Sequence, residues 1–279
     1  RKDYRMKFYK NFTNFQKGFF LFFIIASLIV FFIPVFLPNG SISEVLTPLG
    51  IIGIICTISG VLVSIYTAKA SISGYLWWWI NTITFATIGI AGGLYGQFIE
   101  NLFILLPLQI YGFIAWKMNM KKNNADKIEV KQFTFKQWIL ALVLLAVLWV
   151  AYGYFLLELP FLFKTLFGIT ISADPQIVLD SFTAVTTIAA VYLTGKRFVQ
   201  QWNIWIACNG VAIVMFLIQA IGAGASNPSM LVAYLSDTLS YVQYLIGTIY
   251  GYIMWKNMYK KQRESKIFNK DSNASPKCA

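Results

Sequence analysis

The sequence predicts an all-α integral membrane protein with about eight transmembrane helices. Of its 279 residues, 58% are hydrophobic and only 12% are charged, whereas soluble domains average about 25% charged residues. The apolar residues gather into runs of roughly 20, the length of helix that crosses a bilayer. Basic residues gather between alternate runs. Together these observations indicate a multi-pass helical bundle.

The apolar runs give the predicted helices in order along the chain. Their approximate ranges are 19–37, 48–68, 74–93, 97–116, 138–157, 178–195, 202–221 and 230–255. Pro107 lies inside the fourth run, and we expect it to kink that helix because proline lacks a backbone donor. After the eighth run the chain becomes polar, and we expect it to be disordered beyond Phe268.

The 23 Lys and Arg residues predict the orientation of the chain. Six precede the first run, Lys69 lies between the second and third, six lie between the fourth and fifth, two lie between the sixth and seventh, and seven follow the eighth. Only Lys164 falls on the opposite side. Because basic residues favour the cytoplasmic side, we expect a multi-pass protein of the inner membrane with both termini in the cytoplasm. The net charge of +12 then comes from basic residues beside the membrane, where they attract anionic lipid. The predicted partner is the lipid bilayer, and no nucleic-acid partner is predicted.

Three segments of the first half recur in the same order in the second half. Residues 66–69, 77–81 and 111–117 resemble residues 192–196, 205–209 and 250–256. Each copy holds three predicted spans, so a single linking span lets both copies cross the membrane in the same direction. The pattern predicts an extra first helix followed by a 3+1+3 parallel repeat, an arrangement typical of transporters with a site between the halves.

The predicted organisation follows from the runs, the charges and the repeat. It comprises a basic cytoplasmic N-terminus with the extra first helix (1–47), the first three-helix repeat (48–117), a basic cytoplasmic loop with the linker helix (118–177), the second repeat (178–256) and a basic cytoplasmic tail (257–279).

Paired Trp and Asn residues inside the spans are the main candidates for a binding site. Trp202, Trp205 and Asn209 follow helical spacing and share one face, as do Trp77 and Asn81. A Trp ring offers a stacking surface, and the amide both donates and accepts hydrogen bonds. This combination suits a small, flat ring that is uncharged or cationic. The alternative is that each Asn only ties neighbouring helices together.

Further polar residues lie in the spans, where a polar side chain needs a partner or a wet cavity. The two Asp residues can bind a cation, shuttle protons or bond sugar hydroxyls, and the Thr residues can instead bond their own helix. In the eighth span Asp237 lies on one stripe with Tyr241, Tyr244 and Thr248, and Gln243 lies off that stripe. The weaker candidates are Asp180, Thr183 and Thr187 in the sixth span, Asn101 and Gln109 in the fourth, and Asp237 and Gln243 in the eighth.

Enzyme chemistry has little support in this sequence. There is no His, which removes the commonest general base and metal ligand. No nucleophile elbow or phosphate-binding loop is present, and the three Cys residues lack metal-binding spacing. We therefore expect no catalytic residues, no metal and no cofactor.

The stretch from Asp180-Ser181 through residues 192–196 to Trp202-x-x-Trp205-x-x-x-Asn209 resembles the PnuC family of vitamin and nucleoside transporters. Asn81 and the first Tyr-Gly-x-x-x-Trp ending also match, so the resemblance covers about residues 48–256. It implies a 3+1+3 fold similar in architecture to a full-length SWEET sugar transporter, and a homotrimer. Many relatives have Asn beside the first Tyr-Gly, where this chain has Gln109, and Asn where it has Tyr250. These two positions are therefore candidates for contact with the substrate.

The resemblance implies a transporter that imports nicotinamide riboside by facilitated diffusion, with a separate cytoplasmic kinase trapping the substrate by phosphorylation. Branches of the family are associated with thiamine, riboflavin or deoxynucleosides, so another vitamin or nucleoside is an alternative cargo. A second alternative is a symporter coupled to protons or sodium through Asp180 or Asp237. A third is a membrane receptor that binds ligand without moving it.

Overall fold

The computed structural model describes residues 11–36, 41–91, 95–223 and 228–274. These residues form helices and connecting segments, and one isolated bridge between Lys131 and Phe198 is the only extended pairing among them. The elements are α2 (Asn14–Phe32), η1 (Ile33–Phe36), α3 (Ile42–Val45), α4 (Pro48–Ala68), α5 (Gly74–Ala91), α6 (Tyr95–Ile99), η2 (Glu100–Leu105), α7 (Leu106–Asn123), α8 (Phe135–Phe167), α9 (Ile177–Lys196), α10 (Gln201–Ala223) and α11 (Pro228–Ala274).

Six helices of the described chain are long and apolar enough to cross a membrane. They are Asn14–Phe32, Pro48–Ala68, Gly96–Asn123, Phe135–Phe167, Ile177–Lys196 and Gln201–Gly222. The two remaining predicted spans, 74–93 and 230–255, fall on α5 and inside α11, which pack within the same bundle. The all-helical membrane fold expected from the sequence is therefore present.

Local sequence signals explain where several of these helices begin and end. Thr13 and Thr134 each form a capping box with the Gln three residues later, at the starts of α2 and α8. Arg197 ends α9 in the left-handed conformation, with φ of 68°, and Gly168 ends α8 in the same way. A π-helical turn, η2, comes directly before Leu106-Pro107, and the kink predicted at Pro107 stays a prediction.

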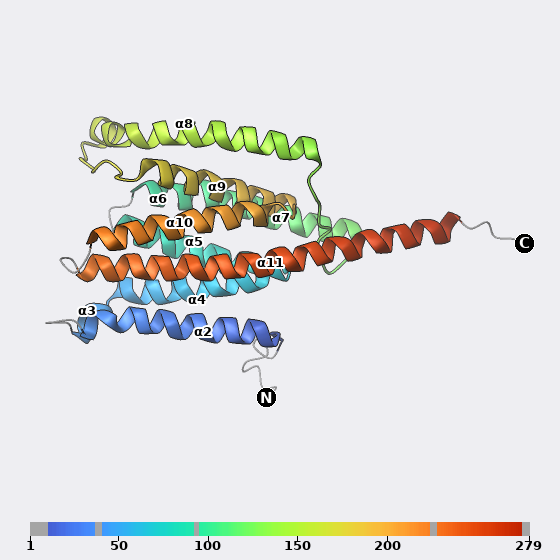
Figure 1. Ribbon diagram of the computed structural model, residues 1–279, viewed down its shortest axis with the longest axis horizontal. Helices are drawn as coiled ribbons and strands as arrows, with labels where there is room; N and C mark the ends of the chain where they lie inside the picture. Colours follow the sequence, from blue (N-terminus) through green and yellow to red (C-terminus); the bar gives the residue numbers. More distant parts are fainter. Residues whose placement is uncertain (1–10, 37–40, 92–94, 224–227, 275–279) are drawn as a thin grey trace, which may run out of the picture.

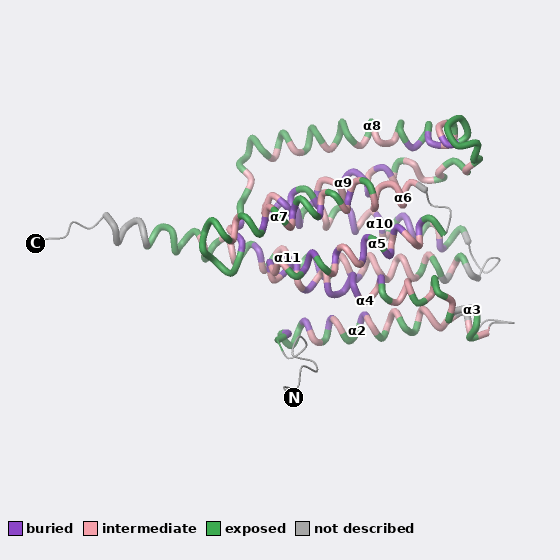
Figure 2. Tube along the Cα trace, turned by 180° about the vertical axis from the view of Figure 1, so that it is seen from behind, coloured by how far each residue is buried: buried purple, intermediate pink, exposed green. Residues whose placement is uncertain are grey.

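The bundle is built so that the two halves of the chain interlock. α7 packs on α9, and α11 packs on α4, so the last helix of each half lies against the first helix of the other half. α2 and α8 lie at opposite edges of the bundle (Figures 1 and 2). α11 continues well beyond the other helices (Figure 1).

The predicted disorder beyond Phe268 is wrong for the described residues, because α11 stays helical to Ala274. Polarity alone suggested disorder, but residues 256–268 just before this segment are rich in good helix formers such as Lys, Gln, Arg and Glu, and the helix continues from them. Lys260 and Glu264 also form an ion pair at i and i+4, a spacing that supports an isolated helix.

A cluster of large aromatic residues fills the bundle at the end where the basic residues gather. This aromatic cluster contains Tyr75, Trp78, Trp116, Trp202 and Trp255, all with 9% or less of their surface exposed. The rings of Trp116 and Trp255 lie 5.7 Å apart, and those of Trp202 and Trp255 also lie 5.7 Å apart. Such contacts bury large apolar area and fix ring orientation.

Two hydrogen bonds of the same kind cross between the halves of the chain. The Trp116 indole donates to the carbonyl of Thr194 over 2.8 Å, and the Trp255 indole donates to the carbonyl of Thr67 over 2.9 Å. Both Trp residues close a Tyr-Gly-x-x-x-Trp segment, and both Thr residues lie in the segments 66–69 and 192–196 that resemble each other. The repeated sequence segments therefore make equivalent contacts in space.

A short segment between α7 and α8, residues 128–133, crosses the basic end of the bundle, and we call it the strap. Its side chains Ile128 and Val130 are buried in the aromatic cluster. The Gln262 side chain accepts from the Val130 amide and donates to the Ile128 carbonyl, each over 2.9 Å. The backbone of Lys131 pairs with Arg197 and Val199 over 2.8 and 2.9 Å. The strap thus joins α7, α11 and the turn before α10.

Candidate functional site

A cavity of about 770 Å³ lies among α4, α5, η2, α9, α10 and α11. Its volume is within the range of about 300–1,000 Å³ that is usual for small-molecule sites. Residues from both halves of the chain line it. The helix contacts of the bundle therefore place this cavity between the two halves.

Aromatic side chains form one wall of the cavity. Trp78 on α5 and Trp205 on α10 have ring centroids 6.3 Å apart and planes tilted by 51°. Trp202, Tyr241 and Tyr244 also line the cavity. Tilted rings at this separation offer π-faces to a flat ligand or to a cation.

Carboxyl groups supply the charge of the cavity. Glu100 comes from η2, Asp180 from the first turn of α9, and Asp237 from α11, and Asp174 lies in the segment before α9. No Lys or Arg lines the cavity in the part of the chain that the structure describes. A site with carboxyl groups and no cation of its own favours a cationic ligand, because an ionised carboxylate attracts it and nothing repels it.

The two Asn residues both line the cavity and tie helices together. Asn81 Nδ2 donates to the carbonyl of Cys56 on α4 over 2.9 Å. Asn209 Nδ2 donates to the Thr248 hydroxyl on α11 over 3.1 Å. The two interpretations considered for these amides, helix contact and cavity lining, are therefore compatible in this structure.

Gln109 and Gln243 are buried behind the cavity wall instead of forming it. Gln109 exchanges hydrogen bonds with the Thr82 hydroxyl over 2.7 and 3.2 Å. Gln243 donates to the Ser64 hydroxyl over 2.9 Å. Since Thr82 and Ser64 line the cavity, each Gln fixes the direction of a hydroxyl that a ligand can reach.

Trp77 and Tyr250 lie away from the cavity. Trp77 packs against a second apolar cluster that joins α2 and α4. The Tyr250 hydroxyl accepts from Gln16 on α2 over 2.9 Å, and its ring stacks on Phe15 at 4.6 Å. Both side chains help to hold α2 on the bundle.

Nine of the thirteen predicted site residues line this one cavity. They are Asn81, Asn101, Asp180, Thr183, Thr187, Trp202, Trp205, Asn209 and Asp237. The four that do not are Trp77, Gln109, Gln243 and Tyr250. Thr183 donates to the Asp180 carbonyl over 2.9 Å, as expected for a Thr inside a membrane helix, and Thr187 lies 3.3 Å from the Cys208 sulfur.

Several polar and aromatic lining residues were not among the predicted site residues, among them Trp78, Glu100, Tyr241, Tyr244 and Thr248. A signal for the last three was present, because they share the helical stripe of Asp237. Trp78 is one of three consecutive Trp residues. Trp78 lies three positions before Asn81, and Trp77 lies four positions before it. Both spacings put a Trp on the Asn81 face, so periodicity alone does not choose between them.

The cavity is closed toward the basic end of the bundle. Trp78 and Trp202 belong both to the cavity wall and to the aromatic cluster, whereas Trp116 and Trp255 belong to the cluster only. At the opposite end the partly exposed segment 170–176 lines the cavity. The aromatic cluster therefore separates the cavity from the strap.

Comparison with known proteins identifies similarity in sequence and structure to one group of transporters. The family model described as nicotinamide mononucleotide transporter matches residues 50–257. The nicotinamide riboside transporter PnuC of Neisseria mucosa is 26% identical over 261 residues, which are 92% of this chain and 87% of that protein. The protein of the same name from Haemophilus influenzae is 26% identical, covering 77% of this chain and 83% of its own.

A solved structure shares the fold. The crystal structure of the vitamin B3 transporter PnuC superposes with a TM-score of 0.61 at 26% identity, covering 90% of this chain and 94% of that chain. The likeness therefore extends over most of the chain.

Proposed function

This chain belongs to the PnuC family of membrane transporters, and from that premise we propose that it carries nicotinamide riboside by facilitated diffusion. One observation carries the choice of cargo: the cavity joins facing Trp rings to several carboxyl groups and has no Lys or Arg in its described lining. Nicotinamide riboside is a flat pyridinium cation joined to a ribose. Its charge, ring and hydroxyls each have a counterpart in the cavity.

We assign the pyridinium ring to the space beside Trp78 and Trp205. Each ring contact contributes about 0.5–2 kcal/mol through stacking and cation–π attraction. Hydrogen bonds from the cavity to the carboxamide or ribose, with Asn81 and Asn209 as the first candidates, add about 1 kcal/mol each. Several such contacts together reach about 8 kcal/mol, which corresponds to micromolar affinity. That strength permits both capture and release.

For the chain in the membrane we propose eight spans arranged as one helix plus a 3+1+3 parallel repeat, similar to SWEET transporters. The crossed packing of α7 on α9 and of α11 on α4 supports this plan. The distribution of Lys and Arg supports an inner-membrane protein with both termini in the cytoplasm. By resemblance we also propose a homotrimer, and trapping of the cargo by a separate cytoplasmic kinase.

Coupling to an ion gradient is the second candidate mechanism. Glu100, Asp180 and Asp237 all line the cavity, and carboxyl groups inside a membrane protein commonly mark proton or ion pathways. In a uniporter these groups hold the cationic cargo. In a symporter they would also bind a proton or sodium ion that crosses with it.

Uptake into liposomes separates these possibilities. The purified full chain is reconstituted, and uptake of labelled nicotinamide riboside, thiamine, riboflavin and deoxynucleosides is followed. We expect nicotinamide riboside to enter until its internal and external concentrations are equal, with no effect of sodium. Accumulation driven by a proton or sodium gradient would establish the symporter instead. Transport of another compound in place of nicotinamide riboside would overturn the cargo, and binding without uptake would indicate a receptor.

Neighbouring Trp residues supply a matched pair of variants for the same assay. Trp78→Leu removes a ring from the cavity and is expected to raise the half-saturating concentration by about tenfold. Trp77→Leu removes a ring that packs toward α2, and is expected to lower stability while leaving that concentration nearly unchanged. Equal effects of the two variants on half-saturation would move the cargo away from Trp78.

A further inference from the structure

A second, smaller cleft lies at the basic end of the bundle, outside the transport cavity. Its volume is about 160 Å³, equal to about five water molecules in the liquid. That is too small for a nucleoside, since sites for molecules of that size usually exceed about 300 Å³. The lining residues are Gln132, Trp138, Val199, Gln200, Asn203, Tyr252, Lys256 and Tyr259.

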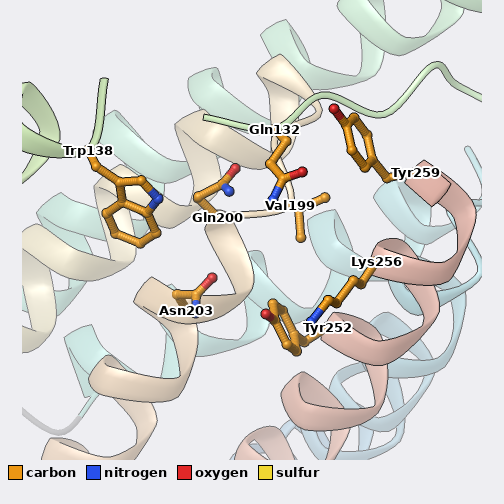
Figure 3. A pocket seen from close by; sticks show the side chains of 8 residues that line it. All are labelled: Gln132, Trp138, Val199, Gln200, Asn203, Tyr252, Lys256 and Tyr259. Atoms are coloured by element: carbon orange, nitrogen blue, oxygen red, sulfur yellow. The ribbon is translucent and has the colours of Figure 1, made fainter. Parts of the chain in front are cut away.

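The cleft carries one positive charge surrounded by hydrogen-bond donors. Figure 3 shows the amides of Gln132, Gln200 and Asn203 between Trp138 on one side and Lys256 on the other. No Asp or Glu lines the cleft, and Lys256 makes no ion pair within the described residues. A cation with amide and hydroxyl donors around it is suited to a phosphate group.

The Gln200 side chain is held in place at the cleft by a contact with the strap. Gln200 is only 4% exposed, and its oxygen accepts from the Phe133 amide of the strap over 2.9 Å. Its Nε2 group makes no hydrogen bond to the described part of the chain, and the side chain lines the cleft. This amide donor opens onto the cleft, so a ligand oxygen there can accept a hydrogen bond from it.

An apolar track leads away from the cleft along the outer face of α10. Starting from Asn203, the positions 207, 210, 214, 217 and 221 follow at helical spacing and form one stripe. Val214, Leu217 and Ile221 are 52%, 40% and 80% exposed, and nothing lies within 4 Å of a Cβ placed on Gly210. In a membrane this stripe faces lipid, so an acyl chain can lie along it directly above the cleft.

We propose that this cleft binds the phosphate of an anionic phospholipid, with one acyl chain along the outer face of α10. Trp138, Tyr252 and Tyr259 surround it, the aromatic side chains that favour the membrane interface. The bound phosphate joins the strap through Gln132, α10 through Gln200 and Asn203, and α11 through Lys256. The lipid therefore stabilises the closed, basic end of the bundle, whichever cargo the transporter carries.

Lipid retention by the purified full chain tests the proposal. The probes are phosphatidylglycerol and phosphatidylcholine with identical acyl chains, compared by native mass spectrometry and by the shift of the thermal unfolding midpoint. We expect preferential retention of phosphatidylglycerol and a higher midpoint with it. Lys256→Gln is expected to reduce that preference about tenfold, as for loss of one charge-assisted contact.

Lys117 is the matched control, because it follows Trp116 as Lys256 follows Trp255 but does not line the cleft. Lys117→Gln is expected to leave the preference unchanged. Equal effects of the two substitutions, or no preference in the unmodified chain, would overturn the proposal.

Two further measurements distinguish a lipid from a soluble anion. Ala207→Trp fills the exposed track one turn from Asn203, and is expected to weaken lipid retention while Lys256 remains in place. Inorganic phosphate and glycerol 3-phosphate are expected to give little thermal shift, since they gain nothing from the track. A shift as large as that of phosphatidylglycerol would show a site for free phosphate and sink the lipid assignment. A change of oligomeric state in Lys256→Gln without a change in lipid retention would assign the cleft to a second copy of the chain.

Discussion

At the scale of single residues, two glycines decide where aromatic rings can go. Gly112 and Gly251 occupy equivalent positions in the two Tyr-Gly-x-x-x-Trp segments. A Cβ on Gly112 would meet the Tyr75 hydroxyl, and a Cβ on Gly251 would lie closer than 3.0 Å to three atoms of the Trp202 ring. Each glycine therefore lets a large ring pack directly on a helix backbone, which shapes the wall between the cavity and the aromatic cluster.

Gly251→Ala is expected to displace Trp202 and to destabilise the protein by about 1–3 kcal/mol, as overpacking usually does. Because Trp202 also lines the cavity, the half-saturating concentration for uptake should rise as well. Thermal unfolding and liposome uptake measure the two effects. Gly53→Ala is the control, since nothing lies within 4 Å of a Cβ there and alanine favours a helix by about 1 kcal/mol. A Gly251 variant as stable as the Gly53 variant would contradict the packing argument.

The residues of the cavity were predictable where helical spacing alone places a side chain. Trp205, Asn209 and Asp237 lie on faces that the spacing identifies, and the structure brings them together. Gln109 and Gln243 have the same polar character, but each is turned onto a hydroxyl of a neighbouring helix. That choice depends on which helix lies alongside, information that one sequence does not contain.

At the scale of elements, the strap has no helical hydrophobic pattern, and it is held by hydrogen bonds to particular backbone and side-chain groups. Its backbone groups bond to α11 and to the turn before α10, so few local signals mark it. The helices were predictable because hydropathy and capping residues are local properties. The strap was not, because its contacts with α11 and with the turn before α10 join residues far apart in the chain.

Glu129 makes the attachment of the strap to α11 and α7 depend on pH. Its carboxylate accepts from Lys266 on α11 and from Asn123 on α7. The hydrogen bond from Lys266, ahead of the nearby positive charges, holds the pKa of Glu129 below its usual value of about 4.3. A carboxyl group with a lowered folded pKa adds stability above its unfolded pKa, and that stability is lost as the pH falls through the folded value.

We therefore expect the strap amides to lose protection as the pH falls below about 4. The pair is solvent-exposed, so its share is about 0.2–1 kcal/mol. Hydrogen exchange at Val130 and Lys131, corrected for intrinsic rates, measures it. Glu129→Gln should remove the pH dependence, whereas Gln262→Leu should lower protection at every pH because it removes two backbone contacts. An unchanged pH dependence in Glu129→Gln would show that another group holds the strap.

At the scale of the whole molecule, the sequence segments that recur lie in two halves of the chain that pack across each other. The sequence predicts the repeat because its Trp and Thr segments recur in order. The contacts between the copies could not be predicted, since they depend on how the halves pack. Each half sends one indole donor to the backbone of the other, and the two indoles meet where the halves join. The closed end of the cavity is therefore held by equivalent contacts from both copies.

This equivalence predicts similar costs for the two substitutions Trp116→Phe and Trp255→Phe. Each removes one indole hydrogen bond to a buried carbonyl, so we expect each to lower stability by about 1 kcal/mol beyond the loss of ring area. Trp79→Phe is the matched control, because the buried Trp79 indole nitrogen has no hydrogen-bond partner among the described residues. Its replacement removes ring area and an unsatisfied donor, so it should cost less than either of the others. Thermal unfolding of the three variants measures the differences. A large cost for only one of Trp116 and Trp255 would mean that a single half holds the closed end, because equivalent contacts carry equivalent energies.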